Sequence, residues 1–293
     1  MTSIDALNDS WKAPGLHFEE GLGDLPIAKL SHEGAETSIA LHGAHVLSYT
    51  PQGAKPILWL SKEAIFKDGK AIRGGIPVCW PWFADHPSEP NYPAHGVART
   101  RSWTVVDTAP ASLTLELQAD ETTRQHFPHD FVLRLQATLS DTLEVKLSIH
   151  NPGQDAFTYT GALHTYFAVS HIDRARVEGL DGRPYIDSID RETRMTQAGP
   201  IRFQDEIDRI YLETEDDCLV CDEEWNRTIR ITKEGSRSTV VWNPWIAKAQ
   251  RMTDFGDQEY QEMLCVETTN AANNAVTVPP GQSHCLQLTL SLN

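Results

Sequence analysis

The sequence lacks long hydrophobic runs, an excess of basic residues and a leader-like N-terminus. No run approaches the roughly 18 apolar residues that cross a bilayer, and the N-terminus has no basic start followed by an apolar core. We therefore expect no membrane partner and no signal peptide. The 41 acidic and 25 basic residues give a net charge of −16, which repels polyanions, so we expect no nucleic-acid partner.

Cysteine is also sparse. The five cysteines are an odd number, and Cys218 and Cys221 form an isolated Cys-x-x-Cys with no second pair, which does not indicate a zinc or redox site. With no export signal, this usage predicts a cytoplasmic protein with free thiols. Nucleotide-binding glycine loops and the nucleophile motif Gly-x-Ser-x-Gly are missing as well. We expect neither a metal nor a cofactor.

What the sequence does contain is alternation of apolar and polar residues with a period of two, as in antiparallel sheets with one buried face. Helical signals are limited to short turns at 122–127 and 205–211, and no repeat or linker divides the chain. These features predict one all-β domain over 1–293, a large sandwich of two antiparallel sheets. The clearest alternating segments are 113–117, 131–139, 143–149 and 286–292.

Two arginine-containing segments are candidates for binding an anionic ligand. Arg73 precedes two glycines and an aromatic cluster in RGGIPVCWPWF (73–83), and Arg99 follows His95 in PAHGVAR (93–99). An anionic substrate would have to overcome the acidic background through such arginines, whose planar fork suits phosphate. The glycine pair permits close approach of the backbone to a ligand. The alternative is that both arginines pair with the abundant surface carboxylates.

Two further segments carry groups that can transfer protons. On a strand, His164 of ALHTYF shares a face with Tyr166, and Glu267 of CVET shares a face with Cys265. Histidine exchanges protons near neutral pH, and a desolvated glutamate is a stronger base than an exposed one. The alternatives are a histidine satisfied within the core and a glutamate that points into solvent.

Asp208 and two tryptophans leave similar alternatives open. Asp208 of DRIY is either a ligand-binding carboxylate or the partner of Arg209 in a structural ion pair. Trp242 and Trp245 of VVWNPW either stack on a sugar or belong to the core.

Taken in this order, RGGIPVCWPWF, PAHGVAR, ALHTYF, DRIY and CVET resemble the aldose 1-epimerase superfamily with its galactose mutarotase-like fold. More closely, the chain resembles the D-hexose-6-phosphate mutarotase (glucose-6-phosphate 1-epimerase) branch, from LHGAHVLSY (41–49) to the last predicted strand. The resemblance implies a large β-supersandwich and an isomerase of carbohydrate metabolism that interconverts the α and β anomers of a hexose 6-phosphate without a cofactor.

The resemblance also implies site residues. By motif, the general acid is His164, the general base is Glu267, Asp208 binds sugar hydroxyls, His95 lines the pocket, and Arg73 and Arg99 bind the phosphate. The base takes the proton of the anomeric hydroxyl while the acid protonates the ring oxygen, so that the ring opens and closes again on the other face. One departure is Ala94, where some relatives have glutamine.

Two other functions fit parts of this pattern. A non-catalytic sugar-phosphate binding or regulatory protein on the same fold would need Arg73 and Arg99 but neither His164 nor Glu267. An accessory domain of a glycoside-processing enzyme would be accompanied by a catalytic domain or an export signal. The preferred hexose 6-phosphate stays open, and we expect a monomer.

Overall fold

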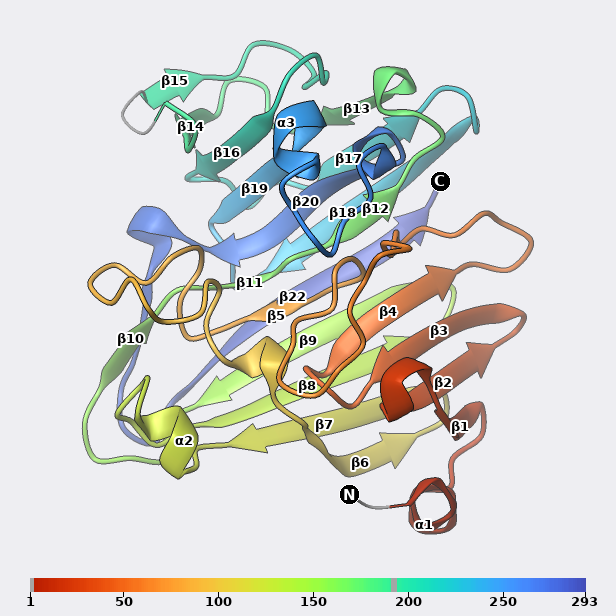
Figure 1. The fold of residues 1–293 in the computed structure, drawn as a ribbon, viewed down its shortest axis with the longest axis vertical. Helices are drawn as coiled ribbons and strands as arrows, with labels where there is room; N and C mark the ends of the chain where they lie inside the picture. The colour runs from red at the N-terminus through yellow and green to blue at the C-terminus, as the bar shows by residue number, and fades with distance from the viewer. Residues whose placement is uncertain (1–2, 191–193) are drawn as a thin grey trace.

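The computed structural model describes residues 3–190 and 194–293, and most of its regular structure is β-strand (Figure 1). The described residues form two eight-stranded sheets, called sheet I and sheet II below, a four-stranded sheet and a two-stranded pair, and every pairing between named strands is antiparallel. The predicted all-β antiparallel sandwich is confirmed. The prediction that 1–293 forms a single domain stays a prediction.

Neighbouring strands in each large sheet come from distant parts of the chain. Across sheet I the order is β15 (Arg194–Thr196), β14 (Pro184–Asp187), β16 (Ile207–Leu212), β19 (Ser238–Asn243), β20 (Met263–Asn270), β11 (Gly161–Leu163) and β5 (Val78–Cys79), with β12 (Tyr166–Ala168) also paired to β20. Across sheet II it is β13 (Ala175–Glu178), β17 (Cys218–Asp222), β18 (Arg227–Glu234), β22 (Ser283–Leu292), β9 (Leu143–His150), β8 (Val132–Leu139), β7 (Ser112–Gln118) and β6 (Thr104–Ala109).

The remaining elements are short. The four-stranded sheet contains β1 (Leu16–Glu20), β2 (Pro26–His32), β3 (Ala35–Ala40) and β4 (His45–Thr50), and the two-stranded pair contains β10 (Phe157–Tyr159) and β21 (Val276–Val278). The helices are α1 (Ile4–Ser10), α2 (Glu121–Arg124) and α3 (Trp245–Ala249), and the 3-10 turns are η1 (Leu22–Asp24), η2 (Ala98–Thr100), η3 (Ile172–Arg174), η4 (Glu259–Gln261) and η5 (Ala272–Asn274).

The segments predicted from alternation are strands, and one predicted helical turn is wrong. The four alternating segments form β7, β8, β9 and β22, and β8 and β9 bury every second residue. The turn predicted at 122–127 corresponds to α2, which Asp120 caps. The turn predicted at 205–211 is instead β16, because this segment pairs with β19 over the whole length of β16 and with β14 on its other side.

Strand β20 shows how period two separates a core face from a second face. Leu264 and Val266 belong to the main hydrophobic core, which also holds buried side chains of sheet II. Met263 and Cys265 point the other way, into a second hydrophobic cluster that includes Ala249 of α3. Glu267 shares this second face, so the carboxylate is held on the α3 side of sheet I rather than in the main core.

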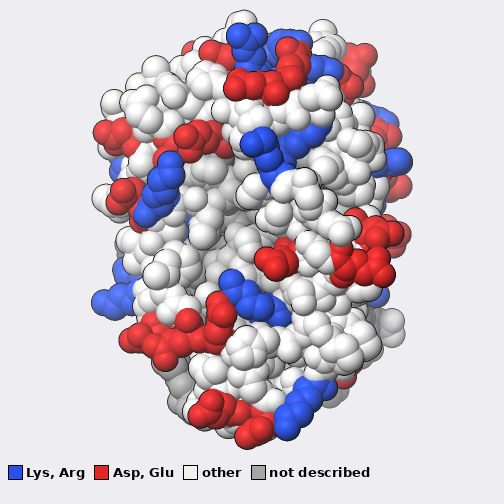
Figure 2. All heavy atoms as spheres, turned by 90° about the vertical axis from the view of Figure 1, so that its right-hand side faces the viewer, with Lys and Arg blue, Asp and Glu red and all other residues white. Residues whose placement is uncertain are grey.

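No helix in the described ranges is long and apolar enough to cross a membrane. The face drawn in Figure 2 carries lysine and arginine side chains interspersed with aspartate and glutamate. It therefore presents no continuous basic surface of the kind that binds nucleic acid.

Candidate active site

Strand register brings a row of side chains together on the second face of sheet I. Tyr166 of β12 lies opposite Cys265 of β20, Cys265 lies opposite Trp242 of β19, and Trp242 lies opposite Asp208 of β16. Glu267 stands two residues farther along β20, on the same face as Cys265. Residues that are far apart in sequence therefore meet because four strands pair in this order.

A cavity of about 270 Å³ lies over this face. Its volume is near the lower end of the roughly 300–1,000 Å³ of small-molecule sites, which suits a ligand of monosaccharide size. A cavity of about 380 Å³ beside α1 has only one titratable side chain in its lining, His42, so we do not regard it as the catalytic pocket. The 270 Å³ cavity is lined by Arg73, Phe83, Ala84, His95, His164, Ser188, Asp208, Ile210, Val240, Trp242, Lys248, Met252 and Glu267. Five of the six predicted site residues are thus brought together, and Arg99 is not in the lining.

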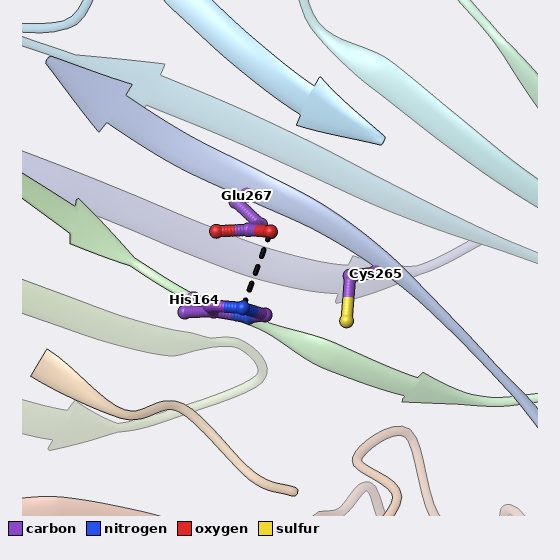
Figure 3. Close-up of side chains that lie close together, drawn as sticks. All are labelled: His164, Cys265 and Glu267. Atoms are coloured by element: carbon purple, nitrogen blue, oxygen red, sulfur yellow. Dashed lines mark ion pairs between the residues drawn. The ribbon is translucent and has the colours of Figure 1, made fainter. Parts of the chain in front are cut away.

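His164 and Glu267 face each other in this cavity (Figure 3). His164 Nε2 lies 3.4 Å from Glu267 Oε1, and the two side chains are 7% and 1% exposed. His164 Nδ1 and Glu267 Oε2 have no hydrogen-bond partner within the described residues. Buried polar atoms without partners are costly, and both belong to residues that line the cavity.

Aromatic rings hold the imidazole in place. The Tyr166 ring stacks on His164 with a centroid separation of 4.8 Å and an interplanar angle of 8°. Trp242 approaches edge-on at 6.2 Å and His95 at 5.5 Å. A ring packed on several sides loses rotational freedom, so His164 presents its nitrogens in a fixed direction.

Burial shifts the pKa values of the two proton-transfer groups in opposite directions. Desolvation raises the pKa of Glu267 well above its usual range, and the nearby Asp208 carboxylate raises it further. Desolvation lowers the pKa of His164 well below its usual range, with Arg99 and Arg73 lowering it further. Both effects disfavour isolated charges, so the pair is held in its net-neutral form, which carries one proton between the two residues.

His95 borders the same cavity in an uncommon backbone conformation. Its φ is +64°, in the left-handed region, and its Nδ1 accepts a hydrogen bond from the Ala84 N–H at 3.2 Å. Burial lowers the pKa of His95 well below its usual range, and Arg99 adds to this. A neutral His95 can offer its other ring nitrogen to a ligand.

Arg73 lines the cavity with much of its guanidinium already engaged. Nε and Nη2 donate to the Asp254 carboxylate at 3.1–3.3 Å, and Nη1 donates to the Tyr166 hydroxyl at 3.0 Å. The alternative of ion pairing is thus realised for Arg73, but with a carboxylate whose side chain is only 18% exposed. Arg99 Nη2 donates to the Ala94 carbonyl at 2.8 Å, while its Nε has no partner among the described residues.

The glycines after Arg73 lie close to neighbouring backbone. Gly74 and Gly75 have φ of +110° and +61°, and a side chain at Gly75 would collide with the Val46 carbonyl oxygen. Both glycines therefore allow close approach to neighbouring backbone, and the expected contact with a ligand stays a prediction.

The sequence pattern did not indicate Lys248 of α3. Its Nζ lies 2.9 Å from Glu206 Oε1 and 3.5 Å from Asp208 Oδ2. Asp208 therefore faces the cavity beside a lysine, whereas Arg209 pairs with Asp187 at 3.5 Å, so the ion pair between neighbours in DRIY does not form. A lysine in a one-turn helix has no distinctive spacing, so no local signal could have pointed to it.

The two tryptophans whose roles the sequence left open lie in different surroundings. Trp242 lines the cavity, and Trp245 packs against Tyr260 with a centroid separation of 5.2 Å.

Comparison with known proteins identifies the family. The family model described as Aldose 1-epimerase matches residues 26–291. The chain belongs to the aldose 1-epimerase family. As a member of that family it is an isomerase that interconverts sugar anomers, and a non-catalytic protein on the same fold is not favoured.

Relatives of this epimerase cover most of its length. A protein from Cenchrus ciliaris named "Putative glucose-6-phosphate 1-epimerase" is 40% identical over 86% of this chain and 80% of its own. A protein of the same name from Escherichia coli (strain K12) is 38% identical, with 91% and 90% covered. The crystal structure of a "putative mutarotase (YeaD)" from Salmonella typhimurium superposes with a TM-score of 0.88 at 35% identity, covering 94% of this chain and 93% of that one. The predicted mutarotase-like sandwich is thereby confirmed.

One group of side chains in the epimerase could hold a metal ion. Donor atoms of His164, Cys265 and Glu267 lie within 4.8 Å of one another (Figure 3). Zinc binds such atoms at about 2.0–2.3 Å, so donors up to 4.8 Å apart would have to move closer together. A metal held there would also occupy the two groups that can transfer protons.

We therefore expect the epimerase to keep full activity after exhaustive chelation. The measurement is the anomerisation rate before and after dialysis against chelator, with residual metal determined by elemental analysis. Added Zn²⁺ should leave the rate unchanged or lower it, because it competes for His164 and Glu267. Activity that disappears with chelator and returns with one particular divalent ion would refute this expectation.

Proposed function

We propose that this epimerase interconverts the α and β anomers of a hexose 6-phosphate, with His164 and Glu267 as the acid–base pair. The observation that carries the proposal is this buried pair, with 3.4 Å between Nε2 and Oε1, at a cavity of monosaccharide size that also contains Arg73. The names of relatives at 38–40% identity support the phosphorylated substrate.

The proposed reaction needs one proton on the pair. When the ring opens, one member accepts the proton of the anomeric hydroxyl and the other protonates the ring oxygen. When the ring closes, each group reverses its role, and attack on the opposite carbonyl face gives the other anomer. Glu267 serves as base and His164 as acid in the opening step, with Asp208 and His95 binding sugar hydroxyls and Arg73 and Arg99 binding the phosphate.

The test is magnetisation-exchange NMR on a panel of free and phosphorylated hexoses, which measures anomer interconversion directly. The proposal expects faster exchange for one or more hexose 6-phosphates than for the matching free sugars. Equal rates for both classes would mean a general aldose mutarotase.

The pH dependence follows from the opposite pKa shifts. Uptake of a second proton by the pair removes activity on the acid side, because no base remains, and since burial lowers the pKa of His164, this limb lies below the usual imidazole range of about pH 6.5. Loss of the last proton from the pair removes activity on the alkaline side, because no acid remains, and since burial raises the pKa of Glu267, this limb is displaced upward. We expect a plateau of kcat/KM across neutral pH, with both limbs belonging to the coupled pair.

This profile should be measured on a free hexose, because the phosphate itself titrates near pH 6. The spontaneous anomerisation rate in each buffer is subtracted. An acid limb at or above the usual imidazole range would show that His164 is not the desolvated member of the pair.

We also propose that the protein is a cytoplasmic monomer. All five cysteines are free, which is compatible with a reducing compartment. Analytical ultracentrifugation at micromolar concentration tests the monomer, and a concentration-dependent increase in mass would contradict it.

A further inference from the structure

Tyr166 contacts both the arginine of the cavity and the histidine of the acid–base pair. Its hydroxyl accepts a hydrogen bond from Arg73 Nη1 at 3.0 Å. Its ring lies nearly parallel to the His164 imidazole, with 4.8 Å between the centroids. A movement of the Arg73 guanidinium is therefore transmitted to the ring against which His164 is packed.

The side chains around Tyr166 leave little room for its ring to move. The side chain is 1% exposed, Trp59 stacks on one side at 5.8 Å, and Trp242 meets it edge-on at 6.0 Å. The Tyr166 N–H donates to the carbonyl oxygen of Gly75, in the segment that carries Arg73. Closely packed interiors transmit displacements instead of absorbing them.

The charge on Arg73 is balanced by the Asp254 carboxylate. Asp254 receives hydrogen bonds from Nε and Nη2, and the two side chains are 23% and 18% exposed. A phosphate dianion at this guanidinium would share or replace these bonds, because it carries more charge than one carboxylate. The same ligand would then alter the hydrogen bond that Arg73 Nη1 donates to the Tyr166 hydroxyl.

We infer that Tyr166 is a positioning residue that couples phosphate binding at Arg73 to the orientation of His164. The phosphate of the substrate then raises kcat and does not merely improve affinity, since remote binding energy is used to orient a reacting group. This inference rests on the proposed function, because it takes a hexose 6-phosphate as the substrate.

Tyr166→Phe tests the coupling, because it keeps the stacked ring and removes the hydrogen bond. We expect kcat for hexose 6-phosphate to fall about 10-fold, the lower end for a hydrogen bond to a charged group. The value for free hexose should fall by less, so that the ratio of the two kcat values decreases. The matched control is Tyr159→Phe, which removes a buried hydroxyl that hydrogen-bonds His284 Nδ1 at 2.7 Å outside the cavity lining. Tyr159→Phe should leave kcat unchanged for both substrates.

A double-mutant cycle and a spectroscopic measurement separate coupling from a merely structural role. In an Arg73→Ala background, Tyr166→Phe should have no further effect on the ratio of the two kcat values. Inorganic phosphate should shift the imidazole ¹⁵N resonances of His164 in the wild type. The shift should be lost in Tyr166→Phe at a phosphate concentration that saturates both proteins by ³¹P NMR.

The outcomes distinguish this inference from the proposed function. If the wild type prefers phosphorylated hexose and folded Tyr166→Phe keeps both the kcat ratio and the His164 shift, the coupling is refuted and the proposed function stands. If Tyr166→Phe changes KM alone, Tyr166 only supports Arg73 and the inference is wrong. If the wild type has no preference for phosphorylated sugar, the proposed substrate fails and the inference fails with it.

Discussion

Glu267→Gln is expected to lower the anomerisation rate at least about 100-fold, the lower end of what a general acid or base contributes. The amide has nearly the shape of the carboxyl group but cannot exchange a proton. Glu267 is 1% exposed, and its Oε1 is the carboxylate oxygen that lies 3.4 Å from His164 Nε2. His164→Ala should lower the rate by a similar factor, for the same reason.

The two residues are expected to act as a unit. The double substitution should lower the anomerisation rate about as much as the more damaging single substitution. A pair that shares one proton stops working when either member is lost. The rates are measured by magnetisation exchange on variants whose near-ultraviolet circular dichroism and melting temperature match the wild type. Glu116→Gln is the control, since Glu116 is also a buried glutamate but pairs with Arg134 outside the cavity lining. Near wild-type turnover in either folded site variant would refute the proposed roles.

The sequence was most informative where a short pattern determines the outcome. Alternation with a period of two predicted β8 and β9, and the same periodicity correctly put Tyr166 beside His164 and Cys265 on the face of Glu267. Local patterns of this kind survive folding because they describe which side of a strand faces the core. The class of fold could therefore be predicted from local patterns, whereas the roles of His164 and Glu267 as an acid–base pair were implied only by the family resemblance and stay a prediction.

Partner choice across long separations could not be predicted in this way. Asp254 meets Arg73 although 181 positions separate them, and no local pattern in the sequence pairs these two residues. The segment at 205–211 forms β16, because β14 and β19 supply hydrogen bonds on both sides that outweigh a weak local helical preference. Lys248 and the contact of Gly75 with the Val46 carbonyl were missed for the same reason, since both are defined by what lies across the fold.

Arg73→Ala combined with Arg99→Ala is expected to make free and phosphorylated hexose similarly poor substrates. The net charge of −16 opposes binding of a sugar phosphate, so a preference for it requires local cations. A hydrogen bond to a charged group contributes about 1.5–3 kcal/mol, so each arginine should account for about 10- to 150-fold in phosphosugar specificity. Arg73 should account for more, because it lines the cavity and Arg99 does not. The kcat/KM for the free sugar should change little, because Asp208 and His95 remain to bind its hydroxyls.

The quantity to measure is the ratio of kcat/KM for hexose 6-phosphate to that for free hexose, at two salt concentrations. Higher salt should lower this ratio in the wild type and have little effect in the double variant, because screening acts on the charged substrate. Arg73→Ala also leaves the Asp254 carboxylate without its partner, which would itself repel phosphate. Comparison with Arg73→Ala/Asp254→Asn separates the lost attraction from this new repulsion, and Arg134→Ala on β8 controls for the loss of an arginine elsewhere. If the double variant keeps the wild-type ratio, Arg73 and Arg99 are structural and the phosphate is bound by other groups, with Lys248 as the next cation of the cavity to test.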